Sequence, residues 1–146
     1  MTTTDFSSTL LVDQRPETVF DAIKKVRGWW TENVEGNTEH LNDFFEVRFD
    51  DVHYSRQQLV ELIPARKVVW LITDSRLSFI SDKSEWTGTR VVFDITEQEG
   101  QTQLRFTHIG LKPEIECYGA CSNAWSGYMR NSLFNLITKG EGQPAK

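Results

Sequence analysis

The sequence has little cysteine, little proline and no long apolar run. Its 146 residues include 2 cysteines and 4 prolines. No stretch approaches the roughly 20 apolar residues that a membrane-spanning helix needs. The first residues, Met1 to Asp5, lack the basic start and apolar run of a secretory signal. We therefore expect a protein without a membrane span, located in the cytoplasm.

Basic side chains are also scarce. The chain has 16 Lys and Arg against 21 Asp and Glu, which gives a formal net charge of −5. Proteins whose main partner is nucleic acid concentrate positive charge on one surface, so this balance argues against nucleic acid as a partner. The length fits one unit with its own core, and we expect residues 1–146 to form a single domain.

The two cysteines, Cys117 and Cys121, are four residues apart in a segment with helical periodicity. A regular helix makes such side chains neighbours but supplies poor geometry for a disulfide. We therefore expect free thiols, as in a reducing compartment. Adding His53 or His108 does not produce the paired ligand spacing of a structural zinc site, so we expect no metal and no other cofactor.

The N-terminal part predicts a strand followed by a short helix. Ser7 to Val12 reads as the strand, and Pro16 stands where a helix tolerates proline, at its first position. The apolar stripe of the helix consists of Val19, Phe20, Ile23 and Val26. Gly28 is expected to end this helix. The stretch from Trp29 to Asn37 is too polar and too rich in turn formers to hold regular structure for long.

The middle of the chain predicts antiparallel strands. Apolar and polar residues alternate, or β-branched and aromatic residues dominate, in residues 45–49, 67–73, 91–96 and 103–108. The turns between them are too short for parallel crossovers, which favours an antiparallel meander. Between Leu59 and Ile63 the alternation is not clean, and the register there stays open.

A long segment, Glu114 to Thr138, follows the last strand and has helical periodicity, ending at Gly140. At 100° per residue, one apolar stripe forms. Its members are Ile115, Tyr118, Ser122, Trp125, Met129, Leu133 and Leu136. We expect this stripe to lie against the sheet.

Several motifs in the second half carry a family resemblance. They are Trp86-Thr87-Gly88-Thr89, Phe106-Thr107-His108-Ile109-Gly110-Leu111, Glu116-Cys117-Tyr118, Cys121, Trp125 and Ser132-Leu133. In this order the chain resembles the helix-grip proteins of the START and SRPBCC superfamily. It looks closest to bacterial single-domain members of the branch named for the activator of the heat-shock-protein-90 ATPase.

That resemblance implies an α+β fold, in which a curved antiparallel β-sheet wraps around a long C-terminal α-helix. Short N-terminal helices follow the first strand, in the order β-α-α-β5-α, and a hydrophobic pocket lies between sheet and helix. Members include lipid carriers, hormone receptors, cyclases and chaperone regulators, so the resemblance implies little about chemistry.

From the positions that face each other, we expect an aromatic pocket that suits an apolar or aromatic ligand. The expected lining residues are Trp29, Trp30, Trp70, Phe106, His108, Tyr118, Cys121, Trp125 and Met129. His108 reads either as a ligand donor or general base, or as a histidine that ties the end of a strand to the helix. We favour the second reading because no matched carboxylate or nucleophile accompanies it, and we assign no catalytic residue.

Three function classes remain. The first, which we prefer, is a binding or carrier protein for a small hydrophobic or aromatic molecule. The second is a chaperone ATPase regulator, although the chain offers no separate N-terminal chaperone-binding domain. The third is a pocket enzyme that uses His108 as acid or base. Segment 77–86 is too apolar for an ordinary loop and reads as a lid or a partner surface, and with exposed sheet edges it is compatible with a homodimer.

Overall fold

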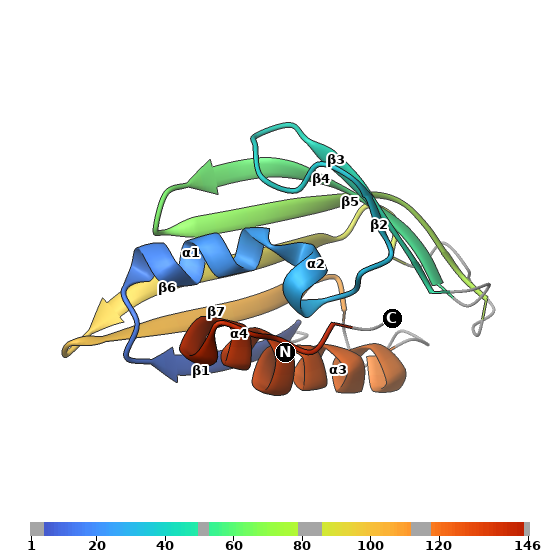
Figure 1. Ribbon diagram of the computed structural model, residues 1–146. Helices are drawn as coiled ribbons and strands as arrows, with labels where there is room; N and C mark the ends of the chain where they lie inside the picture. Colours follow the sequence, from blue (N-terminus) through green and yellow to red (C-terminus); the bar gives the residue numbers. More distant parts are fainter. Residues whose placement is uncertain (1–4, 50–52, 79–85, 112–117, 145–146) are drawn as a thin grey trace, which may run out of the picture.

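A curved antiparallel sheet wraps around a C-terminal helix (Figure 1). The computed structural model describes residues 5–49, 53–78, 86–111 and 118–144. Within these residues, seven strands lie in the order β1-β7-β6-β5-β4-β3-β2. The strands are β1 (Phe6–Val12), β2 (Val34–Gly36), β3 (Phe44–Phe49), β4 (His53–Ile63), β5 (Lys67–Leu77), β6 (Arg90–Gln98) and β7 (Gln101–Ile109). The expected α+β helix-grip architecture is confirmed, with β2 as a strand that the expected order did not include.

Two short helices follow β1, as expected: α1 (Pro16–Lys24) begins with proline at its first position, and α2 (Val26–Trp29) adds one turn. The prediction that Gly28 ends the helix is wrong. The break lies at Lys25, whose φ of −83° and ψ of 63° are not helical. Gly28 lies inside α2, where Leu136 packs so closely that a Cβ on the glycine would be 3.4 Å from the leucine Cδ2 atom.

The C-terminal helix runs without a break through α3 (Tyr118–Gly127), a π-helical segment η1 (Tyr128–Leu133) and α4 (Phe134–Lys139). It ends as predicted at Gly140, whose φ is 81°. Its expected first residues, 114–117, lie outside the described residues. Figure 1 shows this helix and the N-terminal pair on the same face of the sheet.

The buried stripe of this helix follows the prediction as far as the π-helical segment. Ser122, Trp125, Met129 and Leu133 are buried as expected. In α4 the buried residue is Ile137, whereas the predicted Leu136 is half-buried. A π-helical turn holds one residue more than an α-helical turn, so every later side chain is rotated relative to the α-helical pattern.

The register that the sequence left open is explained by a β-bulge in β4. Leu59 pairs with Trp70, and Glu61 pairs with Val69, the residue directly before Trp70 in β5. Val60 is therefore the extra residue of the bulge, and the inward-outward alternation is interrupted there. Leu59 is fully buried on the inner face, and Val60 is half-buried.

All five tryptophans are buried, each 4 % exposed or less. Trp29 and Trp30 stack on Trp70 of β5 with ring centroids 6.2 and 5.7 Å apart. Trp30 also contacts Trp125 of α3 at 4.9 Å, and Trp86 stacks on Trp125 at 5.8 Å. The indoles therefore fill much of the hollow between sheet and helix.

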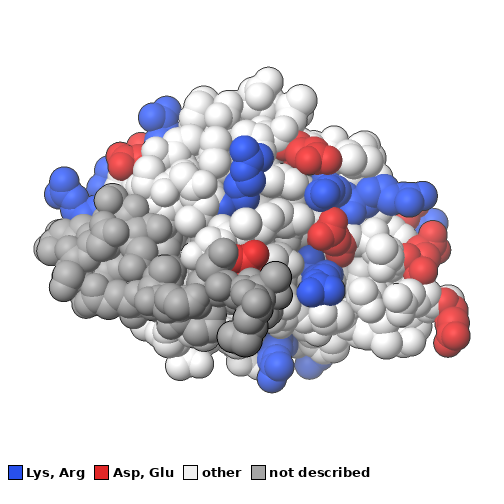
Figure 2. All heavy atoms as spheres, turned by 180° about the vertical axis from the view of Figure 1, so that it is seen from behind, with Lys and Arg blue, Asp and Glu red and all other residues white. Residues whose placement is uncertain are grey.

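The opposite face of the molecule carries side chains of both charge signs. Figure 2 shows Lys and Arg interspersed with Asp and Glu on the side away from the helices. On this side Lys67 pairs with Asp94 at 3.8 Å across two neighbouring strands. The described part of this face thus presents mixed charge rather than the field of one sign on which nucleic-acid binding depends.

Candidate functional site

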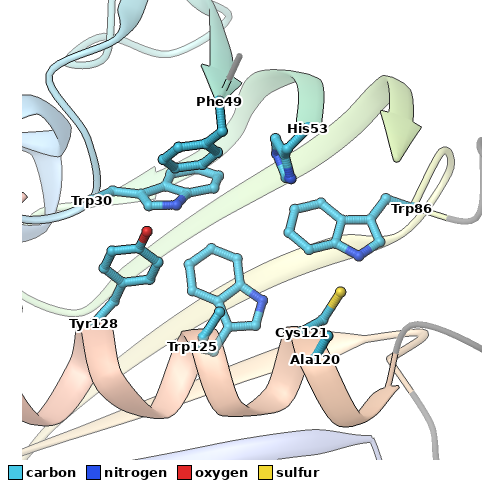
Figure 3. Close-up of a pocket in the computed structure, with 9 residues that line it drawn as sticks. Trp30, Phe49, His53, Trp86, Ala120, Cys121, Trp125 and Tyr128 are labelled. Atoms are coloured by element: carbon cyan, nitrogen blue, oxygen red, sulfur yellow. The ribbon is translucent and has the colours of Figure 1, made fainter. Parts of the chain in front are cut away.

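A cavity of about 190 Å³ lies between the first turns of α3 and the inner face of the sheet (Figure 3). Its walls come from the residue after α2, from the end of β3 and the start of β4, from Trp86 between β5 and β6, and from the C-terminal helix. The lining residues are Trp30, Phe49, His53, Trp86, Ala120, Cys121, Ala124, Trp125 and Tyr128. Segments distant in the sequence thus meet at this cavity.

The sheet wall is built from aromatic rings. Phe49 and His53 are directly opposite each other in the β3–β4 pairing, and their rings meet edge to face at 5.2 Å. The ring of Trp86 lies edge-on to His53 at 4.9 Å. These contacts hold the three rings in fixed mutual positions, so the wall is preformed.

The helix wall follows from helical spacing. The side chains of Ala120, Cys121, Ala124, Trp125 and Tyr128 are separated by one, three or four residues and therefore share one face. The two alanines leave the space that larger side chains would fill. The cavity lies on this face because the small residues come first along the helix and the aromatic residues Trp125 and Tyr128 follow them.

No Asp, Glu, Lys or Arg is among the lining residues that the structure describes. Burial lowers the pKa of His53 to about 4, so the imidazole is neutral near pH 7. Burial raises the pKa of Tyr128, so its hydroxyl keeps its proton. The described walls of the cavity therefore carry no net charge at neutral pH.

Two polar groups of the sheet wall differ in how they are paired. Nε2 of His53 lies 2.9 Å from the Ser55 hydroxyl, which also accepts a hydrogen bond of 2.6 Å from the Gln57 amide. The indole Nε1–H of Trp86 is buried and has no hydrogen-bond partner among the described residues. The cavity thus offers a buried donor that no described side chain or backbone group pairs.

His108 lies outside the lining and connects the sheet to the helix. Trp125 donates its indole N–H to Nδ1 of His108 at 3.1 Å. The Thr89 hydroxyl donates to the Trp86 carbonyl at 2.6 Å, so its oxygen accepts from Nε2 of His108 at 2.9 Å. Both ring nitrogens are therefore engaged, and burial lowers the pKa of His108 to about 3. In this structure His108 ties the end of β7 to α3.

Of the pocket residues expected from the sequence, Trp30, Cys121 and Trp125 line the cavity. The others that are buried pack in the surrounding core: Trp29, Trp70, Phe106, His108 and Met129. Tyr118 is half-buried against that core. A ligand contact for any of these nine residues stays a prediction.

Sequence reasoning missed six lining residues: Phe49, His53, Trp86, Ala120, Ala124 and Tyr128. The helix residues had a signal, since Ala124 lies three residues from Cys121, Tyr128 lies three from Trp125, and Ala120 directly precedes Cys121. Phe49 and His53 had none, because only the β3–β4 pairing brings them to the cavity. Trp86 had an indirect signal, because it lies in the apolar segment 77–86 that reads as a lid or a partner surface.

The apolar segment 77–86 belongs partly to the core. Leu77, the last residue of β5, is fully buried, and Trp86 is 4 % exposed. Phe79 and Ile80 lie outside the described residues, so a lid or a partner surface there stays a prediction.

The expectation of a free thiol at Cys121 is wrong, because this cysteine is disulfide-bonded in the structure. The expectation assumed two cysteines within one regular helix. The described part of α3 begins only at Tyr118, and position 117 lies outside the described residues. Disulfides are rare in the cytosol, so the thiol argument no longer supports the cytoplasmic location, which stays a prediction.

Among the described side chains, no group of three His, Cys, Asp or Glu could hold a metal ion. Within the same ranges, none of the helices combines the length and apolarity needed to cross a bilayer.

Comparison with known proteins finds similar structures but no matching sequence family. No family model and no curated protein matches the sequence. The solution structure of the Aha1 dimer from Colwellia psychrerythraea has a TM-score of 0.75 at 21% identity, over 95% of this chain and 99% of that chain. Protein SSP2350 from Staphylococcus saprophyticus has a TM-score of 0.70 at 16% identity, over 98% of both chains.

A third similar structure is DynU16, a protein of the dynemicin biosynthetic locus. Its TM-score is 0.66 at 12% identity, over 93% of this chain and 48% of DynU16. At these identities the likeness concerns the fold. The protein therefore has the same fold as these structures, a helix-grip fold in which a curved antiparallel sheet wraps around a C-terminal helix.

Proposed function

We propose that the protein binds or carries a small apolar or aromatic molecule in the cavity between α3 and the sheet. The observation that supports this most directly is an uncharged, mainly aromatic cavity of about 190 Å³ with preformed walls. A concave apolar site with a few polar groups is the usual form of a small-molecule site.

The volume restricts the size of the ligand. Ligand pockets usually measure about 300–1,000 Å³, whereas an apolar cavity of about 150 Å³ can hold benzene. The cavity of about 190 Å³ therefore suits a molecule with one aromatic ring rather than a lipid chain. The stacked indoles of Trp29, Trp30 and Trp70 occupy space that a larger ligand would need.

The proposal can be tested by filling the cavity. Ala124→Leu adds three carbons to a residue that lines the cavity, whereas Asn123→Leu makes an apolar change at the neighbouring residue outside the lining; both positions are exposed. With toluene as the probe in isothermal titration calorimetry, the native chain and the Asn123 variant should bind and the Ala124 variant should not. Thermal unfolding would confirm that both variants are folded. Unchanged binding by the Ala124 variant, or no binding by the native chain, would contradict the proposal.

A chaperone ATPase regulator is the second candidate. The observation that favours it is the likeness to the Aha1 dimer over 95% of this chain. The test adds the protein in micromolar excess to the cognate chaperone and measures its ATPase rate. An unchanged rate would remove this candidate. The similar Aha1 structure is a dimer. We therefore propose a homodimer for this chain as well, to be checked by analytical ultracentrifugation.

The enzyme alternative built on His108 has little support. Both ring nitrogens of His108 are engaged by Trp125 and Thr89, and the residue does not line the cavity. A general base needs a free nitrogen within reach of its substrate, so we do not propose this mechanism.

A further inference from the structure

We propose that Trp86 selects the ligand: the cavity takes a neutral, single-ring aromatic molecule whose acceptor oxygen receives the indole N–H of Trp86. This inference rests on the proposed function, since it names the ligand class of the same cavity. It depends on three observations, namely an unpaired donor, an uncharged lining and a small volume.

The first observation is the state of the Trp86 indole. Its Nε1–H is buried without a partner, although the ring is fixed by contacts with Trp125, His53 and His108 at 5.8, 4.9 and 4.9 Å. Buried donors in native proteins are almost always paired with protein, water or ligand. Figure 3 shows this nitrogen on the side of the ring that faces α3, across the cavity. A ligand in the cavity would find the donor already oriented.

Two other buried indoles, Trp125 and Trp29, contrast with Trp86. Trp125 gives its N–H to His108, and Trp29 gives its N–H to the Ile23 carbonyl at 3.0 Å. These two donors are used within the protein and hold the core together. The Trp86 donor has no such use among the described residues, which leaves it available to pair with a ligand.

The second observation is the absence of charge among the described lining residues. A carboxylate in the cavity would lose part of its hydration and meet no Lys, Arg or protonated histidine among these residues, because His53 is neutral near pH 7. A cation would likewise meet no carboxylate. Neutral molecules are therefore favoured over ions of the same shape.

The third observation is the combination of volume and aromatic walls. About 190 Å³ accommodates one ring with a small substituent. Trp86 and Trp125 are nearly parallel, with 13° between their planes, and Phe49 adds a further ring to the wall. Aromatic rings prefer offset-stacked and edge-to-face neighbours, which this wall provides.

Three probes of almost equal shape separate these requirements. Acetophenone carries an acceptor oxygen, α-methylstyrene replaces that oxygen with a methylene group, and benzoate replaces the methyl group of acetophenone with a charged oxygen. Calorimetry with the full-length chain near pH 7 should show acetophenone binding about fivefold more tightly than α-methylstyrene, the factor expected for one neutral hydrogen bond. Benzoate should bind roughly tenfold more weakly than acetophenone, or not at all.

The donor can be identified directly. In ¹H–¹⁵N spectra the indole cross-peak of Trp86, assigned by its loss in Trp86→Phe, should move with acetophenone and stay nearly unmoved with α-methylstyrene. Trp86→Phe keeps an aromatic ring but lacks the N–H, so it should bind both probes with equal affinity. Tyr128→Phe is the matched control, because it removes a hydroxyl from the same lining and should keep the fivefold preference.

The outcomes separate the two proposals. If acetophenone and α-methylstyrene bind equally and the Trp86 cross-peak does not follow the acceptor, the selection by Trp86 is wrong while ligand binding stands. If benzoate binds as tightly as acetophenone, the requirement for neutrality is wrong. If neither neutral probe binds, both proposals fail. The spectra of the native chain decide the question even if the Trp86 variant does not fold.

Discussion

The indole N–H of Trp125 and Nδ1 of His108 form a hydrogen bond of 3.1 Å that joins helix α3 to strand β7. Both residues are buried, at 2 % and 0 % exposure. A buried donor and acceptor would each be costly without the other. Their pairing fixes how the helix sits in the sheet, and it places the helix wall of the cavity opposite Trp86.

Removing the acceptor should destabilise the fold. His108→Phe keeps a ring of similar size but leaves the Trp125 N–H unpaired, which should lower the free energy of unfolding by about 1–3 kcal/mol in urea titration. In a double-mutant cycle with Trp125→Phe, the losses should not add, because the second change no longer breaks an intact bond. Strictly additive losses would show that the bond contributes nothing to stability.

Stability should fall on acidification through the two buried histidines. Burial lowers the folded-state pKa of His53 to about 4 and that of His108 to about 3, whereas in the unfolded chain histidine titrates near 6.5. Between these values the unfolded state binds more protons, so the free energy of unfolding rises with pH there. Going from pH 7 to pH 5 should therefore cost roughly 1–2 kcal/mol per histidine.

Urea titrations at both pH values would measure this loss. His53→Phe should remove about half of the pH-dependent change. A pH-independent free energy of unfolding between pH 7 and pH 5 would contradict the burial of both imidazoles.

Two glycines should respond to alanine in opposite directions. Gly127 lies inside the continuous C-terminal helix, and a Cβ there would meet nothing within 4 Å. Gly127→Ala should raise the free energy of unfolding by about 0.5–1 kcal/mol, because glycine is a poor helix former. Gly110 has a φ of 106°, and a Cβ would lie 2.6 Å from the Thr89 methyl group.

Gly110→Ala should therefore lower the stability by more than the Gly127 variant raises it, through backbone strain and the collision with Thr89. Thermal unfolding of the two variants side by side would show the contrast. A stabilising Gly110→Ala change would mean that this turn does not have the left-handed backbone described.

Cys121 should be unreactive until it is reduced, because it is disulfide-bonded. Iodoacetamide added to the protein as purified under air should leave Cys121 unmodified, and addition after dithiothreitol treatment should label it. Peptide mass spectrometry reads out both states. Labelling of Cys121 before reduction would show that Cys121 is a free thiol in solution, as its sequence spacing suggested.

Much of the secondary structure could be predicted because its signals are local. Pro16 marks the start of α1, Gly140 ends α4, and alternating residues mark β6 and β7. The signals fail where the backbone departs from a regular period. The bulge at Val60 and the π-helical segment 128–133 each insert one residue, and the expected faces change there.

The candidate site was less predictable than the fold. The sequence indicated an aromatic interior, and Trp30 and Trp125 do line the cavity. It could not separate them from Trp29 and Trp70, which fill the core instead. All four are buried tryptophans. Periodicity along the chain predicts that a side chain is buried, but it does not predict whether the ring contacts a cavity or other core side chains.

The sequence by itself determined the order of strands and helices, the long C-terminal helix and the richness of the interior in aromatic side chains, because these depend on neighbours along the chain. Only the tertiary structure decided that His108 is bonded to Trp125, that Trp86 is left with an unpaired N–H, and that the remaining space is small. The physical reason is that packing and hydrogen bonding join residues from distant segments, and the volume left between them depends on all of those contacts together.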